Sequence, residues 1–260
     1  KVPYFKKGNL SPVGLFYTGD EPIGNVKEFL EGLVTVQDES GQMVAEIMDP
    51  KENCSILDMC AAPGSKTFHM ASKINNKGKI VAIDLYEHRI QLLKNQIKRL
   101  GATSVIPVCY DSTKLLEKYQ EESFDYVLLD APCSGYGVVR RKPDLLVNID
   151  QKDLDGILSL QKELIDVAVK LVKKQGTLVY STCTYSVEED EKMINEELAP
   201  SFLGGNDDNS QLENFDYYPP VIEEVSITQD VTPATPYMSI NDNMSEVEDI
   251  YSLLCDNVSS

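Results

Sequence analysis

The chain has 260 residues, of which 42% are hydrophobic, and its formal net charge is −18. This length and this composition suffice for a sizeable hydrophobic core in one large or two small domains. No apolar run approaches the roughly 18 residues of a membrane span, so the sequence excludes an integral membrane protein, and the acidic balance counts against a nucleic-acid substrate unless local motifs argue for one.

The first residues show little regular pattern. Residues 1–32 hold Gly, Pro and scattered aromatic residues, which we interpret as loops and short strands from a preceding domain. The chain opens with neither Met nor a signal peptide, so we expect a fragment of a longer protein. The run from Leu33 to Val36 predicts a short strand. The apolar spacing from Ser40 to Met48 predicts a helix that Asp49-Pro50 ends.

A regular alternation of strands and helices follows. The predicted strands cover residues 55–59, 79–84, 104–109, 124–130 and 177–181, and the predicted helices cover residues 65–74, 86–100, 157–173 and 186–198. Ser186-Val187-Glu188-Glu189 has the pattern of a capping box, which predicts the start of the last helix. Alternating strands and helices build a parallel sheet with helices on both faces, so we predict an α/β fold.

The acidic charge is concentrated at the end of the chain. Residues 201–260 contain 12 Asp and Glu but no Lys or Arg. The segment is rich in Asn, Asp, Ser and Pro, a composition typical of a solvated and partly mobile chain. Within it, Pro219–Ile227 and Pro236–Ile240 are candidate strands that could complete the sheet.

In a parallel α/β sheet, ligands bind beyond the carboxyl ends of the strands. The turn Cys60-Ala61-Ala62-Pro63-Gly64-Ser65-Lys66 follows the first strand, and its small residues let the backbone approach a ligand closely. Asp84 and Asp111 end the next two strands, where a carboxylate can accept hydrogen bonds from ribose hydroxyls. Together these features fit a nucleoside-containing cofactor. Each alone also fits an ordinary tight turn or a helix cap.

Two further strand ends carry thiols. Asp130-Ala131-Pro132-Cys133-Ser134-Gly135 ends one predicted strand, and Thr182-Cys183 ends the next. If these strands are neighbours, both thiols face the ligand crevice. Lys66 and the run Arg140-Arg141-Lys142 are the cations that could favour a thiolate there.

The other cysteines fit the usual role of a reduced cysteine, a small buried hydrophobic residue. They are Cys54, Cys60, Cys109 and Cys255. Because no Cys-x-x-Cys spacing is present, we expect no structural zinc and no other metal. We also expect the thiols to be reduced, as in a cytoplasmic protein.

A carboxylic acid, two thiols and a nucleoside cofactor together fit methylation of carbon 5 of a pyrimidine. That carbon becomes nucleophilic only after a thiolate has added to carbon 6. A group such as Asp130 must hold a proton at ring nitrogen 3 while the adduct exists. A second group must then help to remove the proton from carbon 5 and release the adduct.

These segments resemble the motifs of the Nop/Sun (Fmu) family of RNA cytosine-5 methyltransferases, and the resemblance covers residues 33–198 in the right order. The matching segments are Val36–Ser40, Asp58-Met59-Cys60-Ala61-Ala62-Pro63-Gly64-Ser65-Lys66-Thr67, Asp130–Gly135 with Gly137 and Arg140–Asp144, and Tyr180-Ser181-Thr182-Cys183-Thr184. The resemblance implies a Rossmann-like class I fold that depends on S-adenosylmethionine. It also implies methyl transfer to carbon 5 of a cytosine in RNA.

The resemblance implies a role for each matching residue. Cys183 is then the nucleophile, Cys133 assists release of the adduct, and Asp130 faces the cytosine and is oriented by Lys66. The methionine part of the cofactor is expected on the turn after the first strand, its ribose on Asp84 and its adenine on Asp111. The implied cofactor-binding set is Cys60, Ala61, Ala62, Pro63, Gly64, Ser65, Lys66, Asp84, Arg89, Asp111 and Asp130.

The resemblance also implies how the chain is organised. Residues 33–200 form the catalytic domain, residues 1–32 are the remnant of a preceding RNA-binding domain, and residues 201–260 form an acidic segment that completes the sheet or stays partly mobile. The expected partner is RNA, ribosomal RNA in particular. We expect a monomer that makes no membrane contact.

Two other functions remain open. A DNA cytosine-5 methyltransferase also has a Pro-Cys loop, in which Cys133 would be the nucleophile, but Thr182-Cys183 would then be unexplained. A non-catalytic scaffold that binds RNA needs no thiol in the crevice, so the paired thiols argue against it. Trapping a covalent adduct with RNA that bears a cytosine analogue distinguishes these functions.

Overall fold

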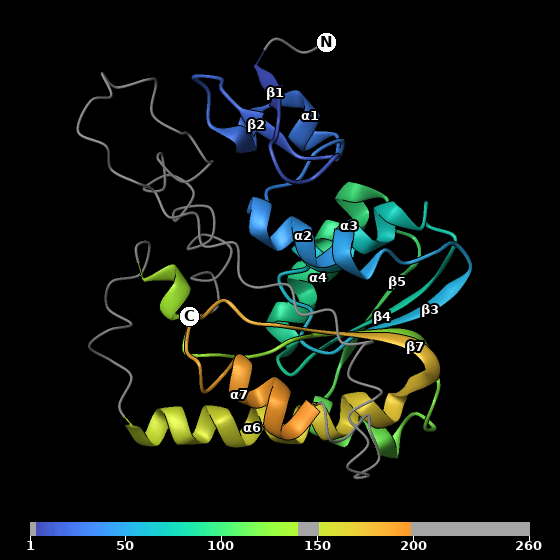
Figure 1. The fold of residues 1–260 in the computed structure, drawn as a ribbon. Coiled ribbons are helices and arrows are strands. Elements are labelled where there is room, and N and C mark those ends of the chain that lie inside the picture. The colour runs from blue at the N-terminus through green and yellow to red at the C-terminus, as the bar shows by residue number, and fades with distance from the viewer. Residues whose placement is uncertain (1–3, 140–150, 199–260) are drawn as a thin grey trace, which may run out of the picture.

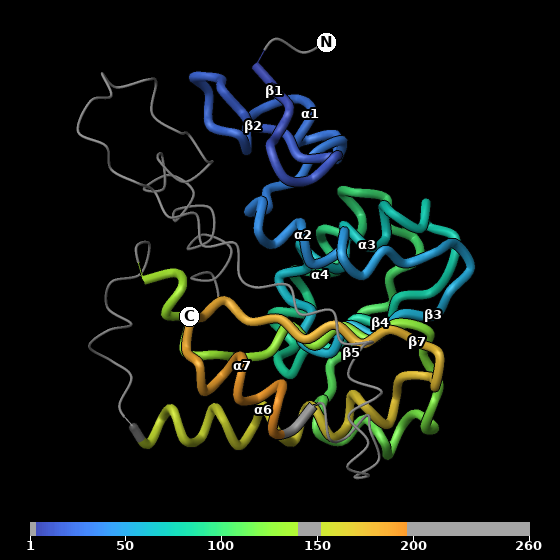
Figure 2. Tube along the Cα trace, in the orientation of Figure 1, coloured from blue at the N-terminus to red at the C-terminus, as the bar shows by residue number. Residues whose placement is uncertain are grey.

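The computed structural model describes residues 4–139 and 151–198. The predictions for Arg140-Arg141-Lys142, for residues 201–260 and for Cys255 lie outside these residues. The centre of the structure is a sheet (Figures 1 and 2). It has five strands in the order β5-β4-β3-β6-β7, and every neighbouring pair is parallel. The strands are β3 (Cys54–Asp58), β4 (Gly78–Asp84), β5 (Val105–Cys109), β6 (Phe124–Asp130) and β7 (Val172–Ser181).

The central strands are apolar because the sheet is buried on both faces. Ile56 and Leu57 in β3 are both 0% exposed, and so are Leu128 and Leu129 in β6. Successive side chains of a strand point to opposite faces, so both faces must be covered. A parallel sheet of this kind requires continuous apolar runs, and such runs are what the sequence pattern detected.

Helices cover both faces, as predicted (Figure 1). On one face lie α2 (Glu39–Met48), α3 (Ser65–Lys73) and α4 (Glu87–Leu100), and on the other lie α6 (Gln151–Leu171), α7 (Glu191–Met193) and the 3-10 helix η2 (Ser112–Glu117). Each face has its own hydrophobic cluster, with Ile56 among the residues of one and Leu57 among those of the other. Among the described helices, none combines the length and the apolar character that crossing a bilayer requires.

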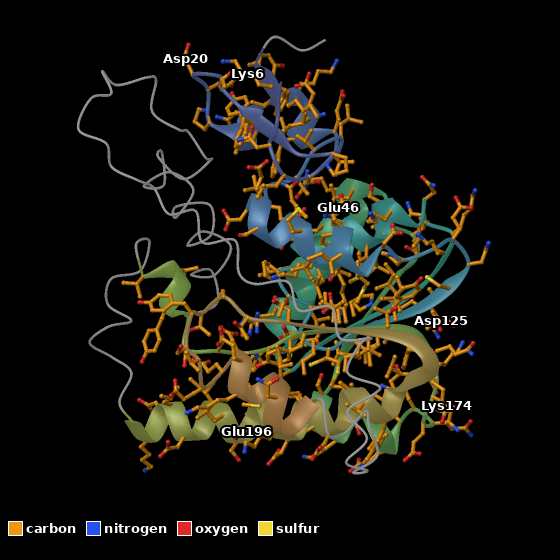
Figure 3. The ribbon with its side chains drawn as sticks, in the orientation of Figure 1. Lys6, Asp20, Glu46, Asp125, Lys174 and Glu196 are labelled. Carbon is orange, nitrogen blue, oxygen red and sulfur yellow. The ribbon has the colours of Figure 1, made fainter. Side chains whose placement is uncertain are left out.

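At the end of the sheet where β6 begins, one carboxylate joins three strands. Asp125 is labelled in Figure 3. It accepts hydrogen bonds from the backbone and the hydroxyl of Ser55 in β3, at 2.8 and 2.7 Å, and pairs with Lys173 in β7 at 2.6 Å. Burial opposes the ionisation of Asp125, but the bonds from Lys173 and Ser55 outweigh it and lower its pKa to about 2. Because α6 ends at Leu171 and Lys173 lies in β7, the predicted helix end at Lys173 is wrong.

The predicted capping box is also wrong. In a capping box, the Glu189 side chain would bond the backbone N–H of Ser186, but that N–H donates to the Thr184 hydroxyl at 3.3 Å. Glu189 is fully buried and bonds to other segments of the chain. The chain turns over residues 187–190, and helical structure begins with α7 at Glu191 and continues as the π-helix η4 (Ile194–Leu198).

Residues 4–30 form a small layer of their own beyond α2 (Figure 1). It contains the antiparallel strands β1 (Phe5–Lys7) and β2 (Leu15–Tyr17), followed by η1 (Ile23–Asn25) and α1 (Lys27–Leu30). The strand predicted for residues 33–36 is absent from the structure. The segment has the predicted apolar pattern, but its backbone accepts a hydrogen bond from a side chain of α4 and does not pair with another strand.

That side chain is Arg99, which holds the segment after α1 against α4. Its guanidinium donates to the carbonyl oxygens of Phe29 and Val34 at 2.6 and 3.0 Å, and to the Thr35 hydroxyl at 3.3 Å. It also lies over the Phe29 ring, 4.0 Å from the ring centroid. Burial lowers the pKa of Arg99. A single cation thus fixes the path of the chain between the small layer and the sheet.

We expect Arg99→Ala to loosen residues 27–35 without unfolding the sheet. The variant leaves partly buried carbonyl oxygens without a donor, which costs about 1–3 kcal/mol. Hydrogen exchange followed by mass spectrometry should show faster exchange in residues 27–35 and unchanged exchange in β3 and β4. Lys98→Ala, at the exposed neighbouring position of α4, is the control. Unchanged exchange in Arg99→Ala would contradict this role.

Candidate active site

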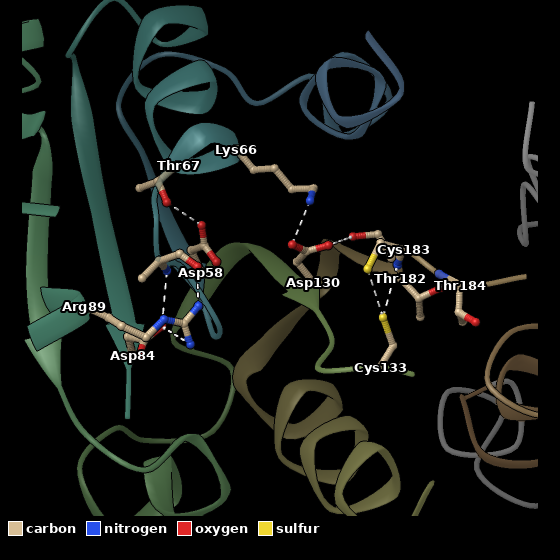
Figure 4. A network of polar contacts seen from close by, with 12 residues as sticks. Asp58, Lys66, Thr67, Asp84, Arg89, Asp130, Cys133, Thr182, Cys183 and Thr184 are labelled. Carbon is tan, nitrogen blue, oxygen red and sulfur yellow. Dashed lines mark hydrogen bonds and ion pairs between the residues drawn. The ribbon is translucent and has the colours of Figure 1, made fainter. Parts of the chain in front are cut away.

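Most of the predicted site residues lie at the carboxyl edge of the sheet (Figure 4). Asp84 is the last residue of β4, and Asp130 is the last residue of β6. Cys133 and Cys183 follow β6 and β7, which are neighbours in the sheet, so the condition for bringing both thiols together is met. The parallel arrangement therefore gathers groups that are distant in the sequence.

Asp84 and Arg89 fasten the turn that follows β3. Asp84 is 3% exposed; one of its oxygens accepts from the Ala62 backbone at 3.3 Å and pairs with Arg89 at 3.2 Å. Its other oxygen accepts from the Tyr86 backbone at 3.2 Å. Arg89 in turn donates to the Ala62 carbonyl at 2.6 Å. The structure thus brings together three members of the predicted cofactor set.

The turn itself depends on Gly64. Its φ is +109°, in the region that favours glycine. A Cβ at this position would lie 2.4 Å from the Phe68 ring and 2.6 Å from Leu93. The helix α3 begins directly afterwards at Ser65. Backbone N–H groups of its first turn are therefore presented at the sheet edge, where they can bind a ligand.

Asp58, the last residue of β3, was missed as a separate site residue. It is 1% exposed, and one of its oxygens accepts from the Thr67 hydroxyl at 2.6 Å. Its other oxygen is buried and has no hydrogen-bond partner in the described structure. Burial raises the pKa of Asp58 to about 7; the Thr67 bond opposes this shift, and the charge of Asp130 adds to it. The signal was present, since Asp58 ends a buried strand as Asp84 and Asp130 do.

Asp111 is used locally in this structure. It precedes η2, and its carboxylate accepts from the backbone and the hydroxyl of Thr113 at 3.1 and 2.8 Å. These bonds lower the pKa of Asp111. The structure therefore supports the helix-cap interpretation of Asp111, and its contact with a cofactor stays a prediction.

Both oxygens of the Asp130 carboxylate are engaged. Lys66 lies 2.7 Å from one, and the Ser181 hydroxyl donates to the other at 2.8 Å (Figure 4). The side chains of Lys66 and Asp130 remain 21% and 30% exposed, so they face the open edge. Ser181 was part of the motif but was not singled out. The carboxylate at the end of β6 is thereby fixed from one neighbouring strand, β7, and one helix, α3.

The two thiols are adjacent, with their sulfur atoms 3.2 Å apart. The backbone N–H of Cys183 also donates to the Cys133 sulfur at 3.3 Å. A hydrogen bond donated by the Cys133 thiol lowers the pKa of Cys183 to about 7. Burial and the negative charge of Asp130 oppose this shift, whereas the positive charge of Lys66 adds to it. The same contact raises the pKa of Cys133. The contact between the two thiols therefore favours the thiolate form of Cys183 over that of Cys133.

The other described cysteines lie elsewhere. Cys54 and Cys60 are partly buried, whereas Cys109 is exposed, so the interpretation of Cys109 as a buried residue is wrong. Its position at the end of β5, on the edge of the sheet, leaves one side of the strand uncovered. All five described cysteines are free thiols.

The family described as 16S rRNA methyltransferase RsmB/F matches residues 45–237. A probable ribosomal RNA small subunit methyltransferase B of Bacillus subtilis is 43% identical over 166 residues, which are 64% of this chain and 37% of that protein. The tRNA (cytosine(72)-C(5))-methyltransferase NSUN6 of Mus musculus is 36% identical over 200 residues, which are 72% of this chain and 41% of that protein. The chain thus spans well under half the length of these relatives.

Solved structures show the same relationship. NSun6 from Pyrococcus horikoshii with SFG is 37% identical and superposes with a TM-score of 0.63, over 68% of this chain and 45% of that chain. A methyltransferase homolog protein from the same organism is 33% identical and superposes with a TM-score of 0.67, over 75% of this chain and 61% of that chain.

The thiol geometry generates a prediction that needs no substrate. Among the described cysteines, Cys183 should react fastest with iodoacetamide near neutral pH, with a midpoint close to pH 7. Burial raises the pKa values of Cys54, Cys60 and Cys109. Peptide mass spectrometry of samples labelled between pH 5 and pH 9 measures each midpoint.

Removing the nearby cation should shift that midpoint upward. Lys66→Met removes a positive charge that favours the Cys183 thiolate, so labelling of Cys183 at pH 7 should slow. Lys79→Met is the control, because Lys79 is exposed near the start of β4, at the opposite edge of the sheet. An identical Cys183 midpoint in both variants would mean that Lys66 does not act on the thiol.

Proposed function

The chain belongs to the RsmB/F family of 16S rRNA methyltransferases, and we propose that it transfers a methyl group from S-adenosylmethionine to carbon 5 of a cytosine in RNA. The observation that carries the proposal is the thiol pair, 3.2 Å apart, beside an aspartate held by Lys66. A covalent route to carbon 5 needs a thiolate, a second proton-handling group and a carboxyl group at the ring. All three are present at one edge of the sheet.

The residues present fit S-adenosylmethionine. The unpartnered buried oxygen of Asp58 can accept from a cationic amino group, and the Gly64 turn allows close approach to a ligand. Asp84 keeps acceptor capacity for ribose hydroxyls, because one of its oxygens accepts only from the Tyr86 backbone. When bound, the cofactor supplies an electrophilic methyl group. The related NSun6 structure holds SFG, an analogue of this cofactor.

The chain's own residues divide the remaining chemistry. The Cys183 thiolate adds to carbon 6 of the cytosine, and the new carbon–sulfur bond makes carbon 5 nucleophilic. Asp130, fixed by Lys66 and Ser181, holds a proton at ring nitrogen 3 while this adduct exists. After carbon 5 has gained the methyl group, Cys183 is no longer a thiolate, so the Cys133 thiol can ionise and accept the carbon-5 proton. The electron pair re-forms the ring double bond and expels the Cys183 thiolate.

Ribosomal RNA is the proposed substrate, because the matching family and the Bacillus subtilis relative are named for it. Residues 33–200 are proposed as the catalytic domain, and residues 1–32 and Arg140-Arg141-Lys142 as contributors to RNA contact. The reaction needs reduced thiols, which favours a cytoplasmic location, and we propose that the protein acts as a monomer. Methylation assays on ribosomal RNA and on transfer RNA distinguish this substrate from that named for NSUN6.

The two thiols should give opposite results when each is removed. Cys183→Ala should abolish both methylation and any covalent RNA adduct, because no carbon–sulfur bond can form. Cys133→Ala should still form the adduct but release it slowly, so protein attached to RNA should accumulate. A denaturing gel of each variant incubated with RNA and S-adenosylmethionine shows the difference. The inverse pattern would make Cys133 the nucleophile, and turnover by both variants would overturn the covalent route.

Cofactor affinity should depend on pH through Asp58. Its pKa of about 7 is raised, so the carboxylate predominates above pH 7 and the uncharged acid below it. Only the carboxylate pairs well with an ammonium group. Affinity for S-adenosylhomocysteine, measured by calorimetry, should therefore fall up to about tenfold from pH 8 to pH 6. Asp58→Asn should bind weakly at both pH values, whereas the exposed control Asp20→Asn should keep the wild-type slope; an unaltered slope in Asp58→Asn would exclude Asp58.

A further inference from the structure

Glu189 is a buried carboxylate that the chemistry above does not use. It is 0% exposed and lies in the turn between β7 and α7. Its carboxylate accepts from the Ser134 backbone at 2.9 Å, from the Ser134 hydroxyl at 2.5 Å and from the Gln161 side chain at 3.1 Å. Burying a carboxylate is costly unless donors surround it. The fold thus supplies three donors to one buried carboxylate, which calls for a role.

The partners of Glu189 all lead to the loop that carries Cys133. Ser134 directly follows Cys133, and the second N–H of Gln161 donates to the carbonyl of Pro132, which directly precedes it, at 3.0 Å. The residues on either side of Cys133 are thus both held by hydrogen bonds, Ser134 by Glu189 and Pro132 by Gln161. Cys133 itself remains partly buried and faces the site.

The same cluster reaches the loop that carries Cys183. The Ser134 hydroxyl lies 2.9 Å from the hydroxyl of Thr184, the residue after Cys183. Glu189 belongs to the same chain segment as Cys183, and its own carbonyl accepts from the Tyr180 hydroxyl at 2.8 Å. One carboxylate thus ties both thiol loops to each other.

We propose that Glu189 is a positioning residue that holds the Cys133 thiol against Cys183, so that Cys133 can donate its hydrogen bond. The contribution to turnover rests on the proposed methyl transfer, but the effect on the thiols does not. With the loop held in place, the Cys183 backbone N–H donates to the Cys133 sulfur at 3.3 Å and keeps that side chain turned toward Cys183. Gly137, whose N–H donates to the Cys183 carbonyl at 3.0 Å, fixes only the far end of the loop.

The test measures the Cys183 thiol in the absence of RNA. In Glu189→Ala, the Cys133 loop loses its acceptor, and Cys183 loses the donor that stabilises its thiolate. The midpoint of iodoacetamide labelling at Cys183 should rise by about one pH unit, and labelling at pH 7 should slow several-fold. Glu188→Ala, an exposed neighbour, is the matched control and should keep the wild-type midpoint.

Two further variants make the result independent of stability. Glu189→Gln keeps the length of the side chain and one acceptor oxygen, so the Cys183 midpoint should rise less than in Glu189→Ala. Ser134→Ala removes the hydroxyl between Glu189 and Thr184 and leaves Gln161 in place, so it should move the midpoint in the same direction even if Glu189→Ala fails to fold. Thermal unfolding shows which variants are folded.

A wild-type midpoint in folded Glu189→Ala, or in folded Ser134→Ala, would overturn the proposal. A shifted midpoint in a protein that methylates no RNA would retain Glu189 as the positioning residue and reject the proposed function instead. With active enzyme, the same variants should lower kcat more than they raise KM for RNA, because the site forms but its thiols are misplaced.

Discussion

The pairing of β6 with β7 is the constraint on which the site depends. Asp130 and Ser181 face each other as the last paired residues of two parallel strands. Because parallel strands end at the same edge, the loops that follow them leave the sheet side by side. Cys133 and Cys183, 50 positions apart in the sequence, meet in this way without any long-range contact of their own being required. The Ser181 hydroxyl then completes the fixation of Asp130.

The same edge gathers three carboxylates, and their partners make them different. Asp84 contacts Arg89 and Asp130 contacts Lys66, so each of these carboxylates has a cation beside it. The side-chain contact of Asp58 is the Thr67 hydroxyl, and burial raises its pKa to about 7. A carboxyl group of this kind ionises when a cationic group of a ligand binds beside it, because the positive charge favours the carboxylate. The edge therefore favours a ligand that is positive near β3.

The sequence predicted what local patterns determine and missed what distant partners determine. Apolar runs located β3 to β7 because burial on both faces leaves a continuous signal. The pattern of Ser186 and Glu189 also fitted a local rule, but the partners of Glu189 are Ser134 and Gln161, 55 and 28 positions away. The strand expected at residues 33–36 failed for the same reason, since Arg99 of α4 binds that backbone. The motifs located the strand-end residues correctly because parallel topology places every strand end at one edge.

The direction of the hydrogen bonds bears on which thiol attacks. The Cys183 backbone N–H donates to the Cys133 sulfur, so that sulfur already serves as an acceptor. Its own proton is then free to point at Cys183, 3.2 Å away. The resulting chain runs from an N–H through the Cys133 thiol to the Cys183 sulfur, and negative charge is most stable at its end. A thiolate on Cys133 would still accept from the Cys183 backbone N–H. The positive charge of Lys66, however, favours the thiolate of Cys183. The arrangement therefore favours Cys183 as the nucleophile and leaves Cys133 as the thiol beside the adduct, which can accept the carbon-5 proton once it has lost its own.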